Sequence, residues 1–135
     1  MGNITEQQPS ICSRAQAIVQ RDKDMLSEIL KSRDGKILSA QDLQDPKKMT
    51  DTYKLAVDRN SIAMDFMMDV KNDIFELKIA LSKVDRSSDL GINVARQLEG
   101  FIKLLTDLLG IIKDEVSKMD RVVRFYERNY NTYSY

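Results

Sequence analysis

The sequence predicts an all-α fold: a long antiparallel helical hairpin of the coiled-coil type, with a shorter N-terminal helix packed on it as in a three-helix bundle. Helix breakers are rare, with 5 glycines and 2 prolines among 135 residues. Two long stretches repeat apolar residues at alternating steps of four and three, which is the 3.5-residue spacing of a coiled coil. No segment alternates strictly between apolar and polar residues, as a half-buried strand would.

The first helix is expected over residues 10–31, after a polar segment, residues 1–9, that we expect to be disordered. Ser10 is a suitable N-cap. Apolar residues recur at steps of three and four on one face, interrupted by Asp22, and a second set widens that face. The two sets are Ile11, Ala15, Ile18, Met25 and Ile29, and Cys12, Val19, Leu26 and Leu30. A turn is predicted at residues 33–36.

The second helix is expected over residues 46–84. Its start is predicted by Asp45 followed by Pro46, because aspartate caps a helix and proline is favoured at the first helical position. The apolar seam has one polar member, Asn60, which we interpret as a residue that sets the register of paired helices. An exposed position where the hairpin frays is the alternative. The seam is Met49, Tyr53, Ala56, Asn60, Ala63, Met67, Val70, Ile74, Leu77, Leu81 and Val84.

The third helix is expected over residues 90–128, after a polar break in which Ser88 or Asp89 can supply the cap. Because the connection is short, the second and third helices should be antiparallel neighbours. Together with the first helix they should form a single helical domain over residues 10–128. The third seam is Val94, Leu98, Phe101, Leu105, Leu108, Ile112, Glu115, Met119, Val122 and Tyr126.

Two apolar groups exceed what the hairpin needs, and both are candidate interfaces. One is a line on the third helix that repeats every seven residues and widens its apolar face. The other is a methionine-rich cluster on the second helix, a composition common at adaptable binding surfaces. Contact with the first helix is the alternative for this cluster. The candidate residues are Ile102, Leu109, Val116 and Val123 in the line, and Met64, Phe66 and Met68 in the cluster.

The C-terminal residues 129–135 form a tyrosine-rich tail. Together with Tyr126, the tail residues Tyr130 and Tyr133 are candidates for docking to a protein, because tyrosine is favoured at protein interfaces. Stacking on single-stranded nucleic acid is disfavoured, since acidic residues dilute the nearby arginines. An unused, frayed end is the remaining alternative.

The residue types needed for catalysis or metal binding are scarce. The chain has no histidine and one cysteine, and its glycines do not fall at phosphate-loop spacing. The carboxylates of Asp65, Asp69, Asp73 and Glu76 lie at helical spacing among lysines, which is typical of a solvated face. We therefore expect no enzyme activity, no cofactor and no metal. Cys12 is interpreted as a small apolar residue, with an intermolecular disulfide as the alternative.

The charge balance restricts the class of partner. With 21 basic and 21 acidic residues, the chain lacks the positive surplus that binds nucleic acid or anionic lipid. The most apolar stretch, residues 101–112, is too short to span a membrane and contains Lys103 and Asp107. The N-terminus lacks the features of a secretory signal. We expect a soluble protein without stable membrane insertion, either cytoplasmic or exported without such a signal.

These observations predict a non-enzymatic protein–protein interaction or structural module, a coiled-coil hairpin that binds a partner helix or assembles with itself into an oligomer. At the level of fold, small hairpins of this kind occur among exported bacterial proteins, secretion-apparatus subunits and their chaperones. The alternative is a regulator of a single target, such as an inhibitor or an immunity protein, which would be a stable monomer with one exposed patch.

Overall fold

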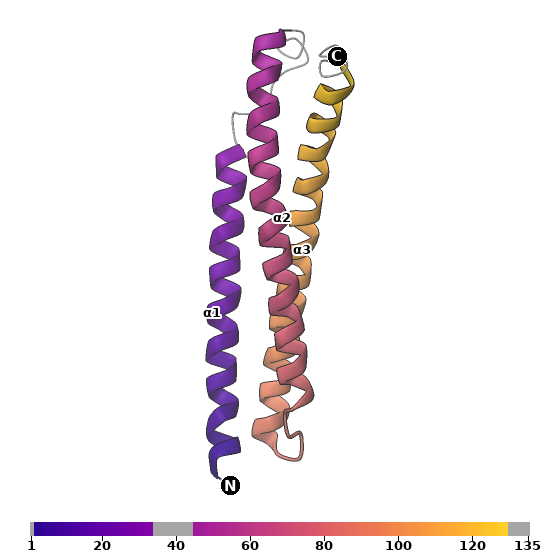
Figure 1. Ribbon diagram of the computed structural model, residues 1–135. Helices are drawn as coiled ribbons and strands as arrows, with labels where there is room; N and C mark the ends of the chain where they lie inside the picture. Colours follow the sequence, from indigo (N-terminus) through magenta and orange to yellow (C-terminus); the bar gives the residue numbers. More distant parts are fainter. Residues whose placement is uncertain (1, 34–44, 130–135) are drawn as a thin grey trace. The chain divides into compact units, whose positions relative to one another are not determined.

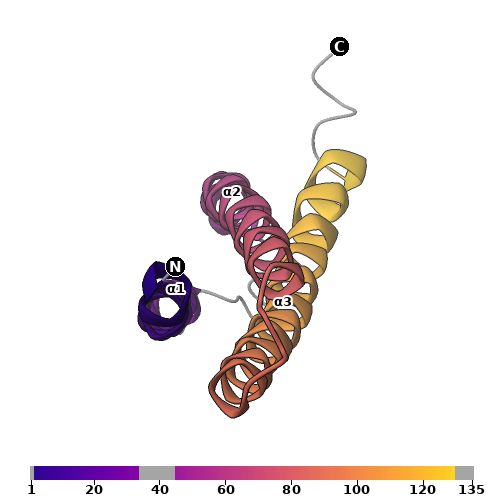
Figure 2. The ribbon, with the colours of Figure 1, turned by 90° about the horizontal axis from the view of Figure 1, so that it is seen from below.

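The structure is a computed structural model that describes residues 2–33 and 45–129, and its helices confirm the all-α prediction (Figure 1). Helix α1 is Gly2–Arg33, α2 is Pro46–Ser82 and α3 is Asp89–Asn129. The long helices α2 and α3 are antiparallel and form the predicted hairpin. Figure 2 views the helices from the end at which residues 83–88 join α2 to α3.

Helix α1 is longer than the sequence predicted. It begins at Gly2 rather than at Ser10, so the helix includes most of the segment that was expected to be disordered, and it ends at Arg33. Once a helix is nucleated, each added residue gains a backbone hydrogen bond without a new nucleation cost. Polar residues can therefore extend a helix that apolar packing has started. Of the turn predicted at residues 33–36, Arg33 is the last residue of α1, and residues 34–36 lie outside the described residues.

The starts of α2 and α3 confirm the predicted caps. The backbone N–H of Lys47 donates to Asp45 Oδ1 at 3.0 Å, and Pro46 is the first helical residue. At α3, the backbone N–H of Gly91 donates to Ser88 Oγ at 3.1 Å. Each oxygen satisfies a backbone donor that has no partner inside the first turn of its helix.

The connection between α2 and α3 is tightly hydrogen-bonded. The backbone N–H groups of Lys83 and Val84 each donate to a carbonyl three residues earlier, at 3.1 and 3.2 Å. This tighter pattern ends α2 at Ser82, two residues before the predicted end. The N–H of Ser87 then donates to Asp85 Oδ1 at 2.9 Å, a side-chain-to-backbone bond that stabilises turns.

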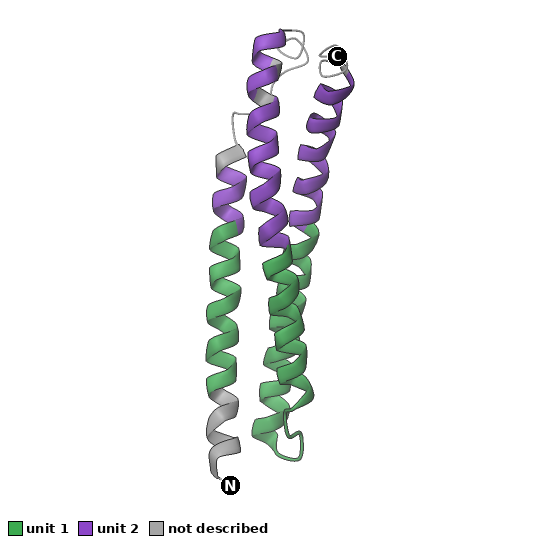
Figure 3. Cartoon of the chain, viewed as in Figure 1, with its two compact units in different colours: residues 1–25, 68–110 green, residues 26–67, 111–135 purple. Residues whose placement is uncertain are grey.

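The chain divides into two compact units (Figure 3). Unit 1, green in the figure, comprises residues 1–25 and 68–110, and unit 2, purple, comprises residues 26–67 and 111–135. Each of these units contains a segment of α1, α2 and α3. The single helical domain expected over residues 10–128 stays a prediction.

The buried residues of both units follow the predicted seams of α2 and α3. In unit 1 the buried apolar side chains of these helices are Val70, Ile74, Leu77, Val94, Ala95, Leu98, Leu105 and Leu108. In unit 2 they are Ala56, Ala63, Phe66, Ile112 and Met119. Heptad spacing therefore identified most of the core on these two helices.

Helix α1 buries a line that differs from the main line predicted for it. The buried residues are Cys12, Ala15, Val19, Asp22 and Leu26, at steps of three and four. Asp22 is thus a member of the buried line rather than an interruption of it, while the predicted member Met25 is exposed. The predicted line was wrong because it assumed that a charged residue stays outside the core. A partner on α2 lowers the free-energy cost of burying Asp22.

Candidate functional site

The outer face of α2 in unit 1 exposes large apolar side chains. Met68, Phe75 and Ile79 are 54%, 64% and 39% exposed, and the exposed Asn72 lies between them. These four residues, which we call the α2 stripe, follow one another at steps of four, three and four. This spacing keeps them on one face of the helix and matches the heptad repeat of helices that pair with another helix.

The α2 stripe lies opposite the face of α2 that is buried in unit 1. That buried face carries Val70, Ile74 and Leu77. Successive residues of a helix are about 100° apart around its axis, so the centres of the two faces lie roughly half a turn from each other. A surface helix normally has a polar outer face. Helix α2 is instead apolar on two sides, and the described residues cover only one of them.

Charged side chains border the α2 stripe, with opposite signs on its two edges. Lys71 and Lys78 lie on one edge, and Asp69 and Glu76 lie on the other, and all four are exposed. Within residues 2–33 and 45–129, none of the four takes part in an ion pair. The stripe therefore has one basic edge and one acidic edge whose charges are free to pair with another molecule.

The residues predicted as an interface occupy different environments. Met64 and Met68 are exposed, whereas Phe66 is buried, as a residue packed inside the chain would be. The role of this cluster as an interface stays a prediction. The line on α3 is half-buried, and two tail residues lie outside the described residues. The half-buried line on α3 consists of Ile102, Leu109, Val116 and Val123, and the two tail residues are Tyr130 and Tyr133.

Phe75 and Ile79 were not predicted as interface residues from the sequence, although a signal for them was present. Phe75 follows Met68 by seven residues, and Ile79 follows Phe75 by four. A second heptad line thus runs along α2 on the side opposite the seam. It was overlooked because the charged residues around it resemble those of an ordinary solvated face.

Tyr126 joins α3 to α2 within unit 2. Its ring stacks on that of Tyr53, with centroids 4.1 Å apart and planes at 17°. The hydroxyls of Tyr126 and Thr50 are hydrogen-bonded at 3.3 Å, and the Tyr53 hydroxyl donates to Glu127 Oε1 at 3.5 Å. The ring of Tyr126 is therefore engaged inside the chain, in contrast to the exposed residues of the α2 stripe.

Asn60 is half-buried in unit 2. Its Oδ1 atom is buried and has no hydrogen-bond partner among the described residues. A buried amide oxygen without a partner costs free energy. The role of Asn60 in setting the register of paired helices stays a prediction.

Unit 1 contains a buried pair of carboxyl groups. Asp22 on α1 is 2% exposed and Asp73 on α2 is 9% exposed. Arg21 Nη2 lies 2.8 Å from Asp73 Oδ2, and Arg21 Nε lies 3.5 Å from Asp22 Oδ1. The prediction that Asp73 belongs to a solvated face was wrong. The physical reason is that its side chain points toward α1, where a second carboxyl and a guanidinium accommodate it.

Burial raises the pKa of Asp22 to about 7, and the hydrogen bond and negative charge of Asp73 add to this effect. The guanidinium of Arg21 acts in the opposite direction and lowers the pKa. Oδ2 of Asp22 is buried and accepts no hydrogen bond from the described residues, which favours the neutral, protonated carboxyl over the carboxylate. Because both carboxyls are buried, a substrate has no access to them, and we assign the pair to the packing of α1 on α2.

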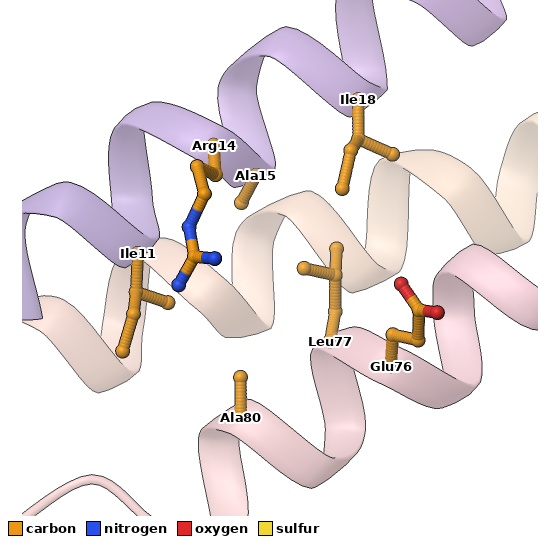
Figure 4. A pocket seen from close by; sticks show the side chains of 7 residues that line it. All are labelled: Ile11, Arg14, Ala15, Ile18, Glu76, Leu77 and Ala80. Atoms are coloured by element: carbon orange, nitrogen blue, oxygen red, sulfur yellow. The ribbon is translucent and has the colours of Figure 1, made fainter.

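A small pocket lies between α1 and α2 in unit 1 (Figure 4). Its volume of about 180 Å³ is below the roughly 300–1,000 Å³ of typical ligand sites. The lining is Ile11, Arg14, Ala15 and Ile18 from α1, and Glu76, Leu77 and Ala80 from α2. Its size and apolar floor indicate a gap in the packing of the two helices.

Cys12 is buried in unit 1, and its Sγ–H donates a weak hydrogen bond to the carbonyl oxygen of Val94 at 4.0 Å. Burial raises the pKa of this thiol, which disfavours the reactive thiolate. This environment supports the interpretation of Cys12 as a small apolar residue. Among the described residues, no group of three or more potential ligands could hold a metal ion.

Comparisons with known proteins identify no function for this chain. No protein-family model matches the sequence, and neither a curated protein nor a solved structure matches it. In residues 2–33 and 45–129, no helix has the combination of length and hydropathy that crossing a membrane requires.

Proposed function

We propose that this protein is a non-enzymatic protein-binding module that presents the α2 stripe to a partner helix. The observation that carries the proposal is the exposure of Met68, Phe75 and Ile79, at heptad spacing, on the side of α2 opposite its buried face. Covering apolar surface is favourable by roughly 25 cal/mol per Å². A large exposed side chain such as Phe75 is therefore a natural anchor for an interface.

The chemistry of the stripe defines the partner. Its residues follow a heptad-like spacing, which favours an amphipathic helix over a flat surface or an extended peptide. The partner helix should place apolar side chains against Met68, Phe75 and Ile79. It should also place an acidic group beside Lys71, because a like charge at that position would oppose binding.

Site-specific photo-crosslinking in the native host tests this proposal. A benzoyl-phenylalanine residue replaces Phe75 in one variant and Leu104, an exposed residue of α3 in unit 1, in the matched control. We expect an adduct from position 75 that the control lacks. Mass spectrometry should map that adduct to a helical segment, and the changes Met68→Lys and Ile79→Lys should abolish it.

Each outcome separates the candidate functions. An adduct with a second copy of the chain or with a helix of another protein supports binding through the α2 stripe. Adducts with one foreign protein and no other would make this module a regulator of a single target. Equal adducts from positions 75 and 104, or none from position 75, would contradict binding through the α2 stripe.

A further inference from the structure

We propose that the partner helix is α2 of a second copy of this chain, aligned parallel to the first around a two-fold axis that runs along the two helices. This inference rests on the proposed function and names the occupant of the same surface. It follows from the signs of the charges along the α2 stripe and from the residue at its centre.

The charged edges of the stripe are complementary to each other in a parallel pair. A two-fold axis along the helices brings the basic edge of one copy against the acidic edge of the other. Lys71 of each copy then faces Glu76 of its partner, five residues further along, and the contact forms twice by symmetry. The four charged groups have no ion-pair partner among the described residues, so the pairing requires no competing contact to break.

An antiparallel pair would bring like charges together. A two-fold axis perpendicular to the helices superposes each edge on the same edge of the other copy. Lys71 and Lys78 of one copy would then face the same lysines, and Asp69 and Glu76 would face the same acids. Like charges at this position are destabilising, so the sequence of the stripe selects the parallel arrangement.

Asn72 supports the same arrangement. It lies between Met68 and Phe75 on the stripe and is exposed. In a parallel pair, each Asn72 meets the same residue of the other copy, and the two amides can hydrogen-bond to each other. A single asparagine at such a position favours two strands in one register, because any shift places its amide against apolar side chains. The β-branched Ile79 occupies the equivalent position of the next heptad.

Sedimentation velocity over a range of concentrations tests self-association. Four side chains per copy form a smaller contact than the roughly 1,200 Å² of stable complexes, so the concentrations should extend to several hundred micromolar, on the order of weak affinities. We expect a monomer–dimer equilibrium. The change Phe75→Asp should weaken it at least about tenfold, because pairing would desolvate two carboxylates. The control Leu104→Asp should leave it unchanged.

Single cysteines test the orientation. In a Cys12→Ser background, Met68→Cys and Ile79→Cys are made separately and oxidised under mild conditions. A parallel pair places each cysteine next to its own equivalent, so each variant alone should form a disulfide-linked dimer. Dimers that form only when the two variants are mixed would show an antiparallel pair and overturn the inference.

Charge exchange completes the test. The change Lys71→Glu should weaken the dimer, and the addition of Glu76→Lys should restore it, because the pairs between copies form again with the signs reversed.

A chain that is monomeric at every concentration, but gives the position-75 adduct with another protein, would overturn self-pairing while the proposed module stands. If position 75 gave no adduct in the host, the proposed module itself would be contradicted. Circular dichroism should show unchanged helicity for the variants at exposed positions, and the two cysteine variants should match their Cys12→Ser background, because Met68 and Ile79 are exposed.

Discussion

Asp22 on α1 and Asp73 on α2 share one cationic partner in the interior of unit 1. One guanidinium, that of Arg21, serves both, at 2.8 Å from Asp73 and 3.5 Å from Asp22. Two ionised carboxylates would leave one negative charge unbalanced in a buried position, which is costly. A proton on Asp22 removes this excess, so we expect the contact between the two helices to depend on pH.

The unfolding free energy should decrease as the pH is raised from about 5 to about 8.5. The folded chain holds the pKa of Asp22 at about 7, above its ordinary value of 3.8. The folded state therefore binds this proton more tightly than the unfolded chain, and the resulting stability is complete below pH 3.8 and is lost as the pH rises through about 7. The loss should be on the order of a few kcal/mol. Urea denaturation followed by circular dichroism at each pH measures it.

The change Asp22→Asn is the control for this pH dependence. The amide has nearly the same shape as the protonated carboxyl and does not titrate. Its unfolding free energy should vary much less over the same pH interval. The chain has no histidine, so no imidazole contributes there. Equal pH dependence of the two proteins would show that Asp22 is not the group responsible.

Adjacent leucines on α3 provide a matched test of the core. Leu105 is 0% exposed, whereas Leu104 is 44% exposed. The change Leu105→Ala should lower the unfolding free energy by about 2–5 kcal/mol, because it removes buried methyl groups and leaves a cavity. The same change at Leu104 should lie within about 0.5 kcal/mol of the original chain. Similar losses at both positions, measured by urea denaturation, would contradict the orientation of α3 in unit 1.

Two glycines of α3 should respond to alanine in opposite directions. A Cβ at Gly91 would collide with the backbone carbonyl of Asp85, whereas a Cβ at Gly100 would meet no described atom within 4 Å. We expect Gly91→Ala to destabilise the chain by roughly 1–3 kcal/mol, since backbone must move. Gly100→Ala should stabilise it by up to about 1 kcal/mol through helix propensity. Thermal or urea unfolding measures both effects. If the two changes altered the unfolding free energy in the same direction, the close approach of Gly91 to Asp85 would be wrong.

The stacked pair of Tyr53 and Tyr126 should couple α2 to α3 in unit 2. A double-mutant cycle with Tyr53→Leu and Tyr126→Leu should give a coupling free energy of about 0.5–1.5 kcal/mol. Tyr53→Phe keeps the stack and removes only the long hydrogen bond to Glu127, so it should have a much smaller effect. A coupling energy near zero would mean that the rings do not stack in solution.

The existence and approximate extent of α2 and α3 could be predicted because the controlling information is local. The cap at Asp45, the cap at Ser88 and the 3.5-residue spacing of apolar residues each act over a few positions of the chain. The starts of α2 and α3 and their buried seams were therefore predicted well. The start of α1 was predicted poorly, because no capping motif marks Gly2 and helix propagation tolerates many polar sequences.

The candidate site could be predicted only in part. Met68 was selected as part of a methionine-rich cluster, but Phe75 and Ile79 were overlooked, and Phe66, which belongs to the same cluster, is buried. A helix with apolar residues on two faces has two ways to pack. The sequence of α2 does not indicate which face the rest of the chain will cover.

The sequence by itself determined that this protein is helical, where its two long helices begin, and which seam joins them, because propensity, capping and apolar period are properties of neighbouring residues. The tertiary structure decided that Asp22 and Asp73 meet and that the α2 stripe stays uncovered. Both results depend on the rotation of each helix about its own axis, which is set by the packing of residues distant in the sequence.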